Sequence, residues 1–240
     1  MNMYKKILSF LIKKTIIYID ILIHRKRIRN FLINTNLKIN TIFDVGSNNC
    51  DYSLLFNQIY PSAEIFAFEP NPYLTEIAII KTKKFQNIKI IQKAAGNLNS
   101  STTLNIDQNS SLTTSLAVTN KNSTTHKIKK FLYGNKEKKV TTIKIIKLDS
   151  FIKSNSCPDF VKIDVEGFEE EVLKGVTNNL KNIKLIMIEF HFDKLYKKYS
   201  THSIHRLLVK NNFKLIKSVK FPILKWEDRF YINTKLAYIF

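Results

Sequence analysis

From about residue 41 onward, short apolar runs rich in β-branched and aromatic residues alternate with segments that have the periodicity of a helix. This alternation constrains the fold more than any other feature of the chain, because it is typical of βαβ units and a parallel sheet. We predict strands at 41–46, 63–69, 88–93, 159–165 and 184–190, and helices at 50–59, 72–82, 168–180 and 202–211. The tail from residue 213 predicts a final hairpin, with its turn at Trp226 to Arg229, that closes an otherwise parallel sheet.

The chain has room for one large α/β domain plus an extra helix or two, since it has 240 residues of which 44% are hydrophobic. We therefore assign residues 37–240 to one domain and residues 1–36 to a helical extension. Two further predicted strands, at 101–107 and 138–147, flank a polar insertion at 105–139. This insertion is either a lid over a binding site or a disordered loop.

The extension repeats apolar residues at helical spacing among many Lys and Arg: Tyr4, Leu8, Leu11, Ile12, Ile19, Leu22 and Ile23. Lys13, Lys14 and Asp20 interrupt its apolar stretches, so neither reaches the roughly 18 to 20 residues of a spanning helix. No small-residue cleavage site follows, so we expect no secretory signal. The extension is either a basic amphipathic helix that contacts an anionic membrane through residues 4–29, or a helix packed on the sheet.

The formal net charge of +20 would attract an anionic partner such as nucleic acid, a lipid surface or an acidic glycan. Lys, Ile and Asn are abundant along the whole chain, however, and no RNA-binding module interleaves aromatic with basic residues. We therefore expect no nucleic-acid partner. Cys50 and Cys157 form neither a metal cluster nor a disulfide framework, which predicts a reducing compartment. This indicates the cytoplasm, with peripheral contact to the inner face of the membrane as an option.

In open parallel sheets, ligands bind beyond the carboxyl ends of the strands. Among the polar residues there, Glu69 gives the sharpest signal, because it follows a buried strand and lies 23 residues after Gly46. This is about the spacing at which an acidic side chain meets ribose hydroxyls in dinucleotide-binding units. Asn71 is a suitable N-cap for the next helix, with Pro72 at its first position, and would fix where Glu69 points.

The stretch DFVKIDVEGFEE, residues 159–170, places charges in a strand that should be buried on both faces. Strand alternation brings several polar side chains to one face, so that they could converge on one pocket: Lys162, Asp164, Glu166, Glu189 and His191. The alternative is a structural ion pair of Lys162 with Asp164 or Glu189. The spacing of these residues matches no dedicated metal motif, so we predict no metal site.

Five ordered motifs carry a family resemblance: FDVGSNNCDYS, FAFEPNP, the AAGN of residues 94–97, TTIKIIKLDSFI and DFVKIDVEGFEEEVLKG. Together they resemble the motifs of FkbM-type methyltransferases, which use S-adenosylmethionine. The resemblance runs from about residue 40 to residue 192. It implies a class I methyltransferase fold, a seven-stranded sheet flanked by helices with an antiparallel last strand. It also implies O-methylation of a hydroxyl group on a sugar, glycan, glycolipid or natural product.

The resemblance implies site residues as well. The loop after the first strand would line the methionine end of the cofactor with Asp44, Gly46, Ser47 and Asn48. Glu69, fixed by Asn71, would bind the ribose. The methyl-acceptor side would have Lys162, Asp164, Glu166 and Glu189. We expect Asp164 or Glu166, and then Glu189, to take the proton of the acceptor hydroxyl, with Lys162 orienting that carboxylate or holding an anionic acceptor.

Cys50 departs from the family pattern, which is close to D-V-G-A-N-x-G-x-Y and has glycine at this position. Glycine tolerates positive φ and a close approach of the backbone to a ligand, both of which a Cβ makes harder. The substitution would weaken cofactor binding, or the chain is a non-catalytic, membrane-associated homologue whose cofactor site has decayed. An RNA methyltransferase is a third reading, suggested only by the charge.

Overall fold

The computed structural model describes residues 3–106, 115–133 and 139–236. Its main element is a seven-stranded sheet with the order β3-β2-β1-β7-β8-β10-β9. The strands are β1 (Thr41–Val45), β2 (Glu64–Phe68), β3 (Ile88–Ile91), β7 (Phe160–Ile163), β8 (Leu185–His191), β9 (Phe213–Lys220) and β10 (Trp226–Asn233). β10 runs antiparallel to both of its neighbours, β8 and β9, and every other pair of adjacent strands in this sheet is parallel. The predicted mostly parallel sheet with an antiparallel last strand is therefore confirmed.

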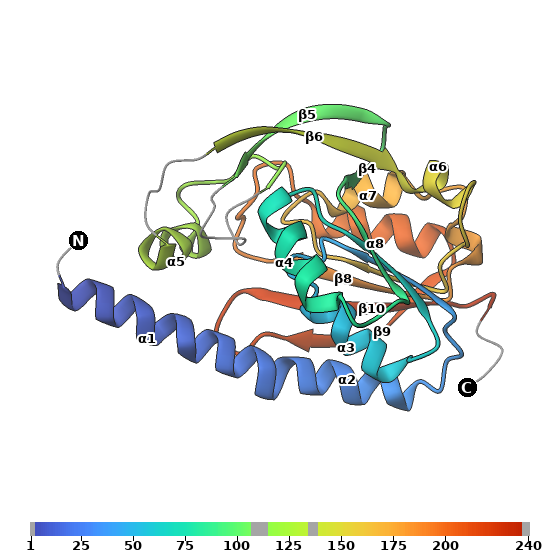
Figure 1. The fold of residues 1–240 in the computed structure, drawn as a ribbon, viewed down its shortest axis with the longest axis horizontal. Helices are drawn as coiled ribbons and strands as arrows, with labels where there is room; N and C mark the ends of the chain where they lie inside the picture. The colour runs from blue at the N-terminus through green and yellow to red at the C-terminus, as the bar shows by residue number, and fades with distance from the viewer. Residues whose placement is uncertain (1–2, 107–114, 134–138, 237–240) are drawn as a thin grey trace.

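Helices cover both faces of this sheet (Figure 1). They are α3 (Asp51–Ile59), α4 (Pro72–Thr82), α6 (Leu148–Ile152), α7 (Glu169–Lys174) and α8 (Thr201–Lys210), with a short 3-10 turn at Leu180–Asn182. Strand alternation divides the core: Val161 and Ile163 pack with α7 and α8, whereas Phe160 packs with α3. Because both faces are covered, the central strands are apolar almost throughout. The charged exceptions stand out for that reason.

A second, three-stranded sheet with the order β4-β6-β5 lies beside the first (Figure 1). Its strands are β4 (Ala94–Gly96), β5 (Ser100–Ile106) and β6 (Lys139–Lys147). The strands predicted on either side of the polar insertion are thus present, but their joining with the AAGN segment was not predicted. Between them, α5 (Thr124–Tyr133) is the helical part of the insertion.

The N-terminal extension is one long helical rod, made of α1 (Met3–Ile19), a π-helical turn η1 (Asp20–His24) and α2 (Arg25–Asn34). Its second half packs on the sheet: Ile28 and Leu32 are buried in the core, and His24 Nε2 lies 2.7 Å from Asp228 Oδ2. Its first half extends past the sheet and contacts α5 (Figure 1). Among the described residues, no helix has both the length and the apolarity needed to cross a membrane. The domain boundary after residue 36 lies just beyond α2 and stays a prediction.

Two local predictions are wrong. The turn expected at Trp226 to Arg229 lies instead at residues 221–225, and Trp226 begins β10. Pro222 has no N–H to donate to a neighbouring strand, which favours a turn there. The rings of Phe221 and Trp226 stack across this turn, with their centroids 4.4 Å apart. The helix expected at 168–180 ends at Lys174. The residues after it are Gly, Val, Thr and two Asn, which are poor helix formers.

Candidate active site

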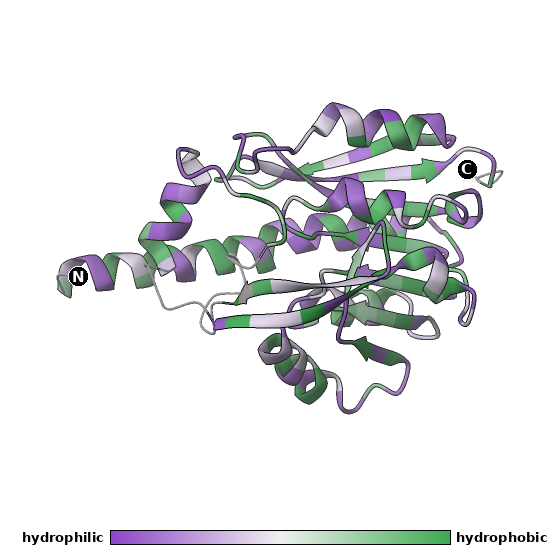
Figure 2. Ribbon diagram, turned by 90° about the horizontal axis from the view of Figure 1, so that it is seen from above, coloured by the Kyte–Doolittle hydropathy of each residue, from purple (hydrophilic) through white to green (hydrophobic). Residues whose placement is uncertain are grey.

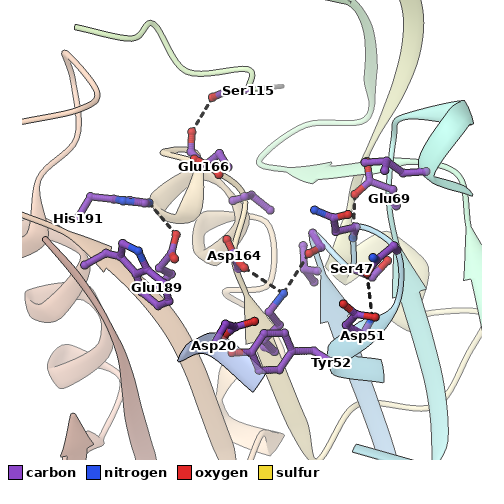
Figure 3. Close-up of a pocket in the computed structure, with 18 of the residues that line it drawn as sticks. Asp20, Ser47, Asp51, Tyr52, Glu69, Ser115, Asp164, Glu166, Glu189 and His191 are labelled. Carbon is purple, nitrogen blue, oxygen red and sulfur yellow. Dashed lines mark hydrogen bonds and ion pairs between the residues drawn. The ribbon is translucent and has the colours of Figure 1, made fainter. Parts of the chain in front are cut away.

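A cavity of about 530 Å³ opens beyond the carboxyl ends of β1, β2, β7 and β8 (Figure 3). This is where strand order reverses between β1 and β7, the position at which open α/β sheets bind ligands. The volume is within the range of small-molecule sites. Glu69 lies at one end of the cavity and Glu189 with His191 at the other, with Asp164 between them (Figure 3).

The loop after β1 is held tightly against its neighbours. The N–H groups of Gly46 and Ser47 both donate to the carbonyl oxygen of Phe68, at 3.0 Å each. Gly46 has φ +77°, and a Cβ on it would lie 1.8 Å from the carbonyl oxygen of Asp164. Only glycine fits this position, so the single glycine of the loop sets its path between β2 and β7. Gly46, Ser47 and Asn48 all line the cavity.

The departure at Cys50 is accommodated by the backbone. Cys50 has φ +64° and ψ +24°, the left-handed conformation in which glycine is favoured. Its side chain is fully buried against Ala67 and Ala78 and is not part of the cavity lining. The physical cost of Cys at this position is therefore backbone strain, and its Cβ does not occupy space where a ligand would lie.

Glu69 is buried and held by two backbone groups. Its Oε2 accepts from the N–H of Asn48 at 3.0 Å, and its Oε1 accepts from the N–H of Asn71 at 2.9 Å. Asn71 in turn caps α4 by accepting from the N–H of Tyr73. Burial raises the pKa of Glu69 to about 7, although both backbone hydrogen bonds lower it. Since a carboxylate has about four acceptor positions, each oxygen of Glu69 can still accept from a ligand hydroxyl.

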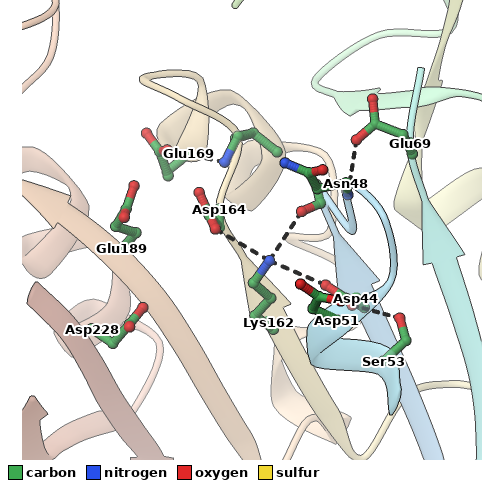
Figure 4. Close-up of polar contacts among 12 residues, drawn as sticks. Asp44, Asn48, Asp51, Ser53, Glu69, Lys162, Asp164, Glu169, Glu189 and Asp228 are labelled. Atoms are coloured by element: carbon green, nitrogen blue, oxygen red, sulfur yellow. Dashed lines mark hydrogen bonds and ion pairs between the residues drawn. The ribbon is translucent and has the colours of Figure 1, made fainter. Parts of the chain in front are cut away.

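Lys162 lies beneath the loop, where it forms a structural cluster (Figure 4). Its Nζ donates to the carbonyl oxygen of Gly46 at 3.0 Å and lies 3.2 Å from Asp44 Oδ1 and 3.3 Å from Asp164 Oδ2. Desolvation opposes its charge, but Asp44 and Asp164 outweigh it and raise the pKa of Lys162. Asp44 also accepts from Ser53 Oγ at 2.6 Å. Lys162 is only 2% exposed, so this arrangement supports a role in positioning the loop more than contact with an acceptor.

Two predicted cofactor residues do not line the cavity. Asp44 is fully buried, because its carboxylate faces Lys162 and Ser53 behind the loop. Asn71 is buried as the cap of α4. Asp44 instead pairs with Lys162, and Asn71 accepts from the N–H of Tyr73 and donates its own N–H to Glu69.

At the opposite end, Glu189 and His191 form an ion pair at 2.8 Å between Glu189 Oε2 and His191 Nε2. Their side chains share one face of β8, as strand alternation predicts. Burial, with the nearby charge of Asp164, raises the pKa of Glu189 to about 8. Desolvation would lower the pKa of His191, but the Glu189 carboxylate outweighs it and raises this pKa. A carboxylate with a pKa near 8 is a suitable proton acceptor near neutral pH.

Glu166 is more heavily engaged. Lys129 of α5 donates to both of its carboxylate oxygens, at 3.0 and 2.8 Å, and the hydroxyl of Tyr196 donates to Oε2. Asp164 is the most open of the three carboxylates, with a side chain that is 30% exposed. The five polar residues predicted to converge do line one cavity. Of the three candidate bases, Glu189 has the arrangement that best suits proton transfer.

Sequence reasoning missed the walls contributed by the N-terminal rod and the insertion. Asp20 and Arg25 of the rod, Lys129 of α5 and Asp228 of β10 all line the cavity. Asp20 pairs with Arg25 at 2.7 Å, and Arg25 also reaches Asp51 at 3.2 Å. The signal that could have found this wall is Asp20 itself, a lone acid in a basic segment.

The lining is acidic although the chain is strongly basic. In the part of the chain that the structure describes, three Lys or Arg line the cavity, each paired with a carboxylate: Arg25, Lys129 and Lys162. Seven carboxylates line it: Asp20, Asp51, Glu69, Asp164, Glu166, Glu189 and Asp228. The cavity therefore favours a ligand that carries positive charge over one that carries negative charge. The described residues form no group of three or more His, Cys, Asp or Glu suited to a metal ion.

Comparison with known proteins identifies related sequences and folds. The profile described as "Methyltransferase FkbM domain" matches residues 44–215. A hexuronic acid methyltransferase, AglP, from Haloferax volcanii is 30% identical over 152 residues, covering 62% of this chain and 55% of that protein. The match thus spans about half the length of this relative. Among solved structures, magnesium protoporphyrin IX methyltransferase (ChlM) from Synechocystis PCC 6803, which has bound S-adenosylmethionine, has the same fold. It covers 90% of this chain and 82% of its own at 11% identity, with a TM-score of 0.51.

Proposed function

The chain belongs to the FkbM methyltransferase family, and from this premise we propose that it transfers a methyl group from S-adenosylmethionine to a hydroxyl group of a sugar-containing acceptor. The observation that carries the proposal is the arrangement of the cavity. Glu69, whose oxygens can accept from ribose hydroxyl groups, lies at one end, and Glu189, a carboxylate with a raised pKa, lies at the other. The relative named a hexuronic acid methyltransferase supports a sugar as the acceptor.

The residues at the Glu69 end fit the cofactor. Each oxygen of Glu69 has one backbone donor and room for one more, which suits the two hydroxyl groups of a ribose. Next to it, Pro70, Leu74 and Ala94 give the cavity an apolar lining that suits a flat base. Gly46, Ser47 and Asn48 supply loop backbone on the side toward Asp164.

The acidic lining supports the same assignment. When bound, S-adenosylmethionine supplies an electrophilic methyl group on a positively charged sulfur. An excess of carboxylates would stabilise that charge, and Asp164 lies between the two ends of the cavity (Figure 3).

At the other end, Glu189 accepts the proton of the acceptor hydroxyl. His191 holds the Glu189 carboxylate at 2.8 Å and so fixes its orientation. No covalent intermediate with the protein is required, so positioning and exclusion of water supply most of the remaining acceleration. Lys162 contributes indirectly, because it holds the Gly46 carbonyl and Asp164 together beneath the reacting groups.

The alternative of a decayed cofactor site rested on Cys50. Its side chain packs into the core and leaves the cavity open, which supports a functional loop. The two readings are separated by binding measurements on the wild type and a Cys50→Gly variant. No binding to the wild type, together with binding to Cys50→Gly, would show that this loop has lost its cofactor and would end the enzymatic proposal.

The experiment that tests the proposal is calorimetric titration with S-adenosylhomocysteine. We expect the wild type to bind and Glu69→Gln to bind about 10- to 100-fold more weakly, since each hydrogen bond to a charged acceptor is worth about 1.5 to 3 kcal/mol. The matched control is Glu64→Gln, at the start of the strand that leads to Glu69, where Glu64 pairs with Lys89 at the surface. Equal affinity of wild type and Glu69→Gln would contradict the assignment of Glu69 to the ribose.

A further inference from the structure

The outer side of the N-terminal rod presents a row of apolar residues to solvent. This outer row consists of Ile7, Leu11, Tyr18 and Leu22, which recur at helical spacing on one side of α1 and η1. All four are exposed, from 46% for Leu22 to 66% for Tyr18. Soluble surfaces rarely leave so many large apolar side chains together without a partner.

The rod cannot rotate to bury this row, because its inner side is fixed at three points. Ser9 Oγ donates to the carbonyl oxygen of Leu132 in α5 at 2.9 Å, and Lys13 lies over the ring of Tyr133 at 4.3 Å. Farther along, His24 and Asp228 form a buried pair. The outer row is therefore held away from the protein by contacts on the opposite side of the helix.

The rod that carries the row is strongly basic. Between residues 3 and 34 the rod has eight Lys or Arg and a single acidic residue, Asp20, which is paired with Arg25. Lys14 is exposed beside the row, and exposed Lys and Arg of α2 continue the charge along the rod. Hydrophobic and hydrophilic residues alternate along the rod (Figure 2). An amphipathic helix of this kind suits an anionic lipid surface. A second copy of the chain is a poor occupant, because each copy has a formal charge of +20.

We propose that the outer row inserts into the interfacial layer of an anionic lipid bilayer, with the Lys and Arg of the rod at the phosphate groups. This interaction goes beyond methyl transfer and does not depend on it. Ile16 and Ile17, on the same helix, line the cavity. Docking of the outer row would therefore bring one wall of the cavity next to the bilayer, where an acceptor held in the membrane could enter it.

The test is sedimentation of the full chain with vesicles. One vesicle preparation contains phosphatidylglycerol mixed with phosphatidylcholine, and the other contains phosphatidylcholine alone. We expect binding to the anionic vesicles that weakens as salt is raised. A variant with Ile7→Ser, Leu11→Ser and Tyr18→Ser should bind about a thousandfold more weakly, since each of the three inserted side chains contributes roughly a factor of ten.

The matched control replaces equally exposed apolar residues elsewhere, in a variant with Ile80→Ser, Leu98→Ser and Val118→Ser. It should bind vesicles like the wild type, and both triple variants should keep wild-type affinity for S-adenosylhomocysteine. The proposal would be overturned if the wild type did not bind anionic vesicles, or if the variant with Ile7→Ser, Leu11→Ser and Tyr18→Ser bound them as well as the control does. Dimerisation of the wild type that only the row variant abolishes would overturn it too, by assigning the row to a second copy. None of these outcomes depends on methyl transfer.

Discussion

The carboxylate of Glu189 makes a prediction about pH that depends on its two neighbours. Burial and the charge of Asp164 raise the pKa of Glu189, His191 lowers it, and together they bring it to about 8. Only the ionised form can take a proton, so its fraction rises from about 1% at pH 6 to about 90% at pH 9. The value of kcat/KM should therefore increase close to a hundredfold over this range and level off above pH 8, because kcat/KM reports the groups of the free enzyme.

Two substitutions should move this pH profile in opposite directions. Asp164→Asn removes a negative charge, so the midpoint should fall, by about one pKa unit. His191→Asn removes the partner that favours the charged form, so the midpoint should rise by a similar amount. Asp164→Asn leaves Lys162 paired with Asp44, at 3.2 Å, which keeps the cluster beneath the loop.

The assay needs two measurements. Methyl transfer to an acceptor chosen from a panel of sugars and glycans gives the kinetic profile. Carbon-13 nuclear magnetic resonance of labelled glutamate side chains gives the titration itself, with Glu189→Gln identifying the signal. A midpoint near the ordinary glutamate value, or shifts of the two variants in the same direction, would refute the reasoning. A kinetic profile that Glu189→Gln leaves unchanged would remove Glu189 as the base.

Two substitutions in the loop after β1 test its backbone. Gly46→Ala should lower the free energy of unfolding by about 3 kcal/mol or more, because its Cβ would overlap the Asp164 carbonyl. A Gly46→Ala variant that unfolds at the same urea concentration as the wild type would contradict this prediction. At Cys50, where φ is +64°, the Gly variant should be more stable than the Ala variant by about 1 kcal/mol, the reverse of the usual order. Thermal unfolding of both variants checks this, and a more stable Cys50→Ala would show that packing of the side chain outweighs strain.

The sheet and the end of it that holds the cavity could be predicted because their signals are local. Buried parallel strands appear as continuous apolar runs, so a charge such as Lys162 within one is conspicuous. Alternation then assigns Glu189 and His191 to one face without knowledge of the rest of the fold. The N-cap of α4 at Asn71 could likewise be predicted from two adjacent residues, Asn71 and Pro72.

What the sequence did not reveal depends on contacts between distant segments. The sequence suggested Asp164 or Glu189 as the ion-pair partner of Lys162, but Lys162 also pairs with Asp44. Asp44 lies directly opposite Lys162 because β1 pairs with β7 in that register. Lys129 reaches Glu166 only because the insertion folds back over the cavity. The polar pattern of Trp226 to Arg229 resembles a turn, yet Arg229 is held in β10 by Glu227 and by the ring of Phe190.

The position of β10 has a consequence for how this chain reaches its fold. β10 lies between β8 and β9, so the interior of the sheet stays incomplete until residues 226–233 have been synthesised. In the same strand, Phe230 packs against Phe31 and Asp228 pairs with His24, and both of these partners belong to the N-terminal rod. A segment made early by the ribosome must therefore wait, with its apolar side uncovered, for one made nearly 200 residues later. Such late, long-range closure should slow folding, and it leaves the apolar side of the rod uncovered until β10 has joined the sheet.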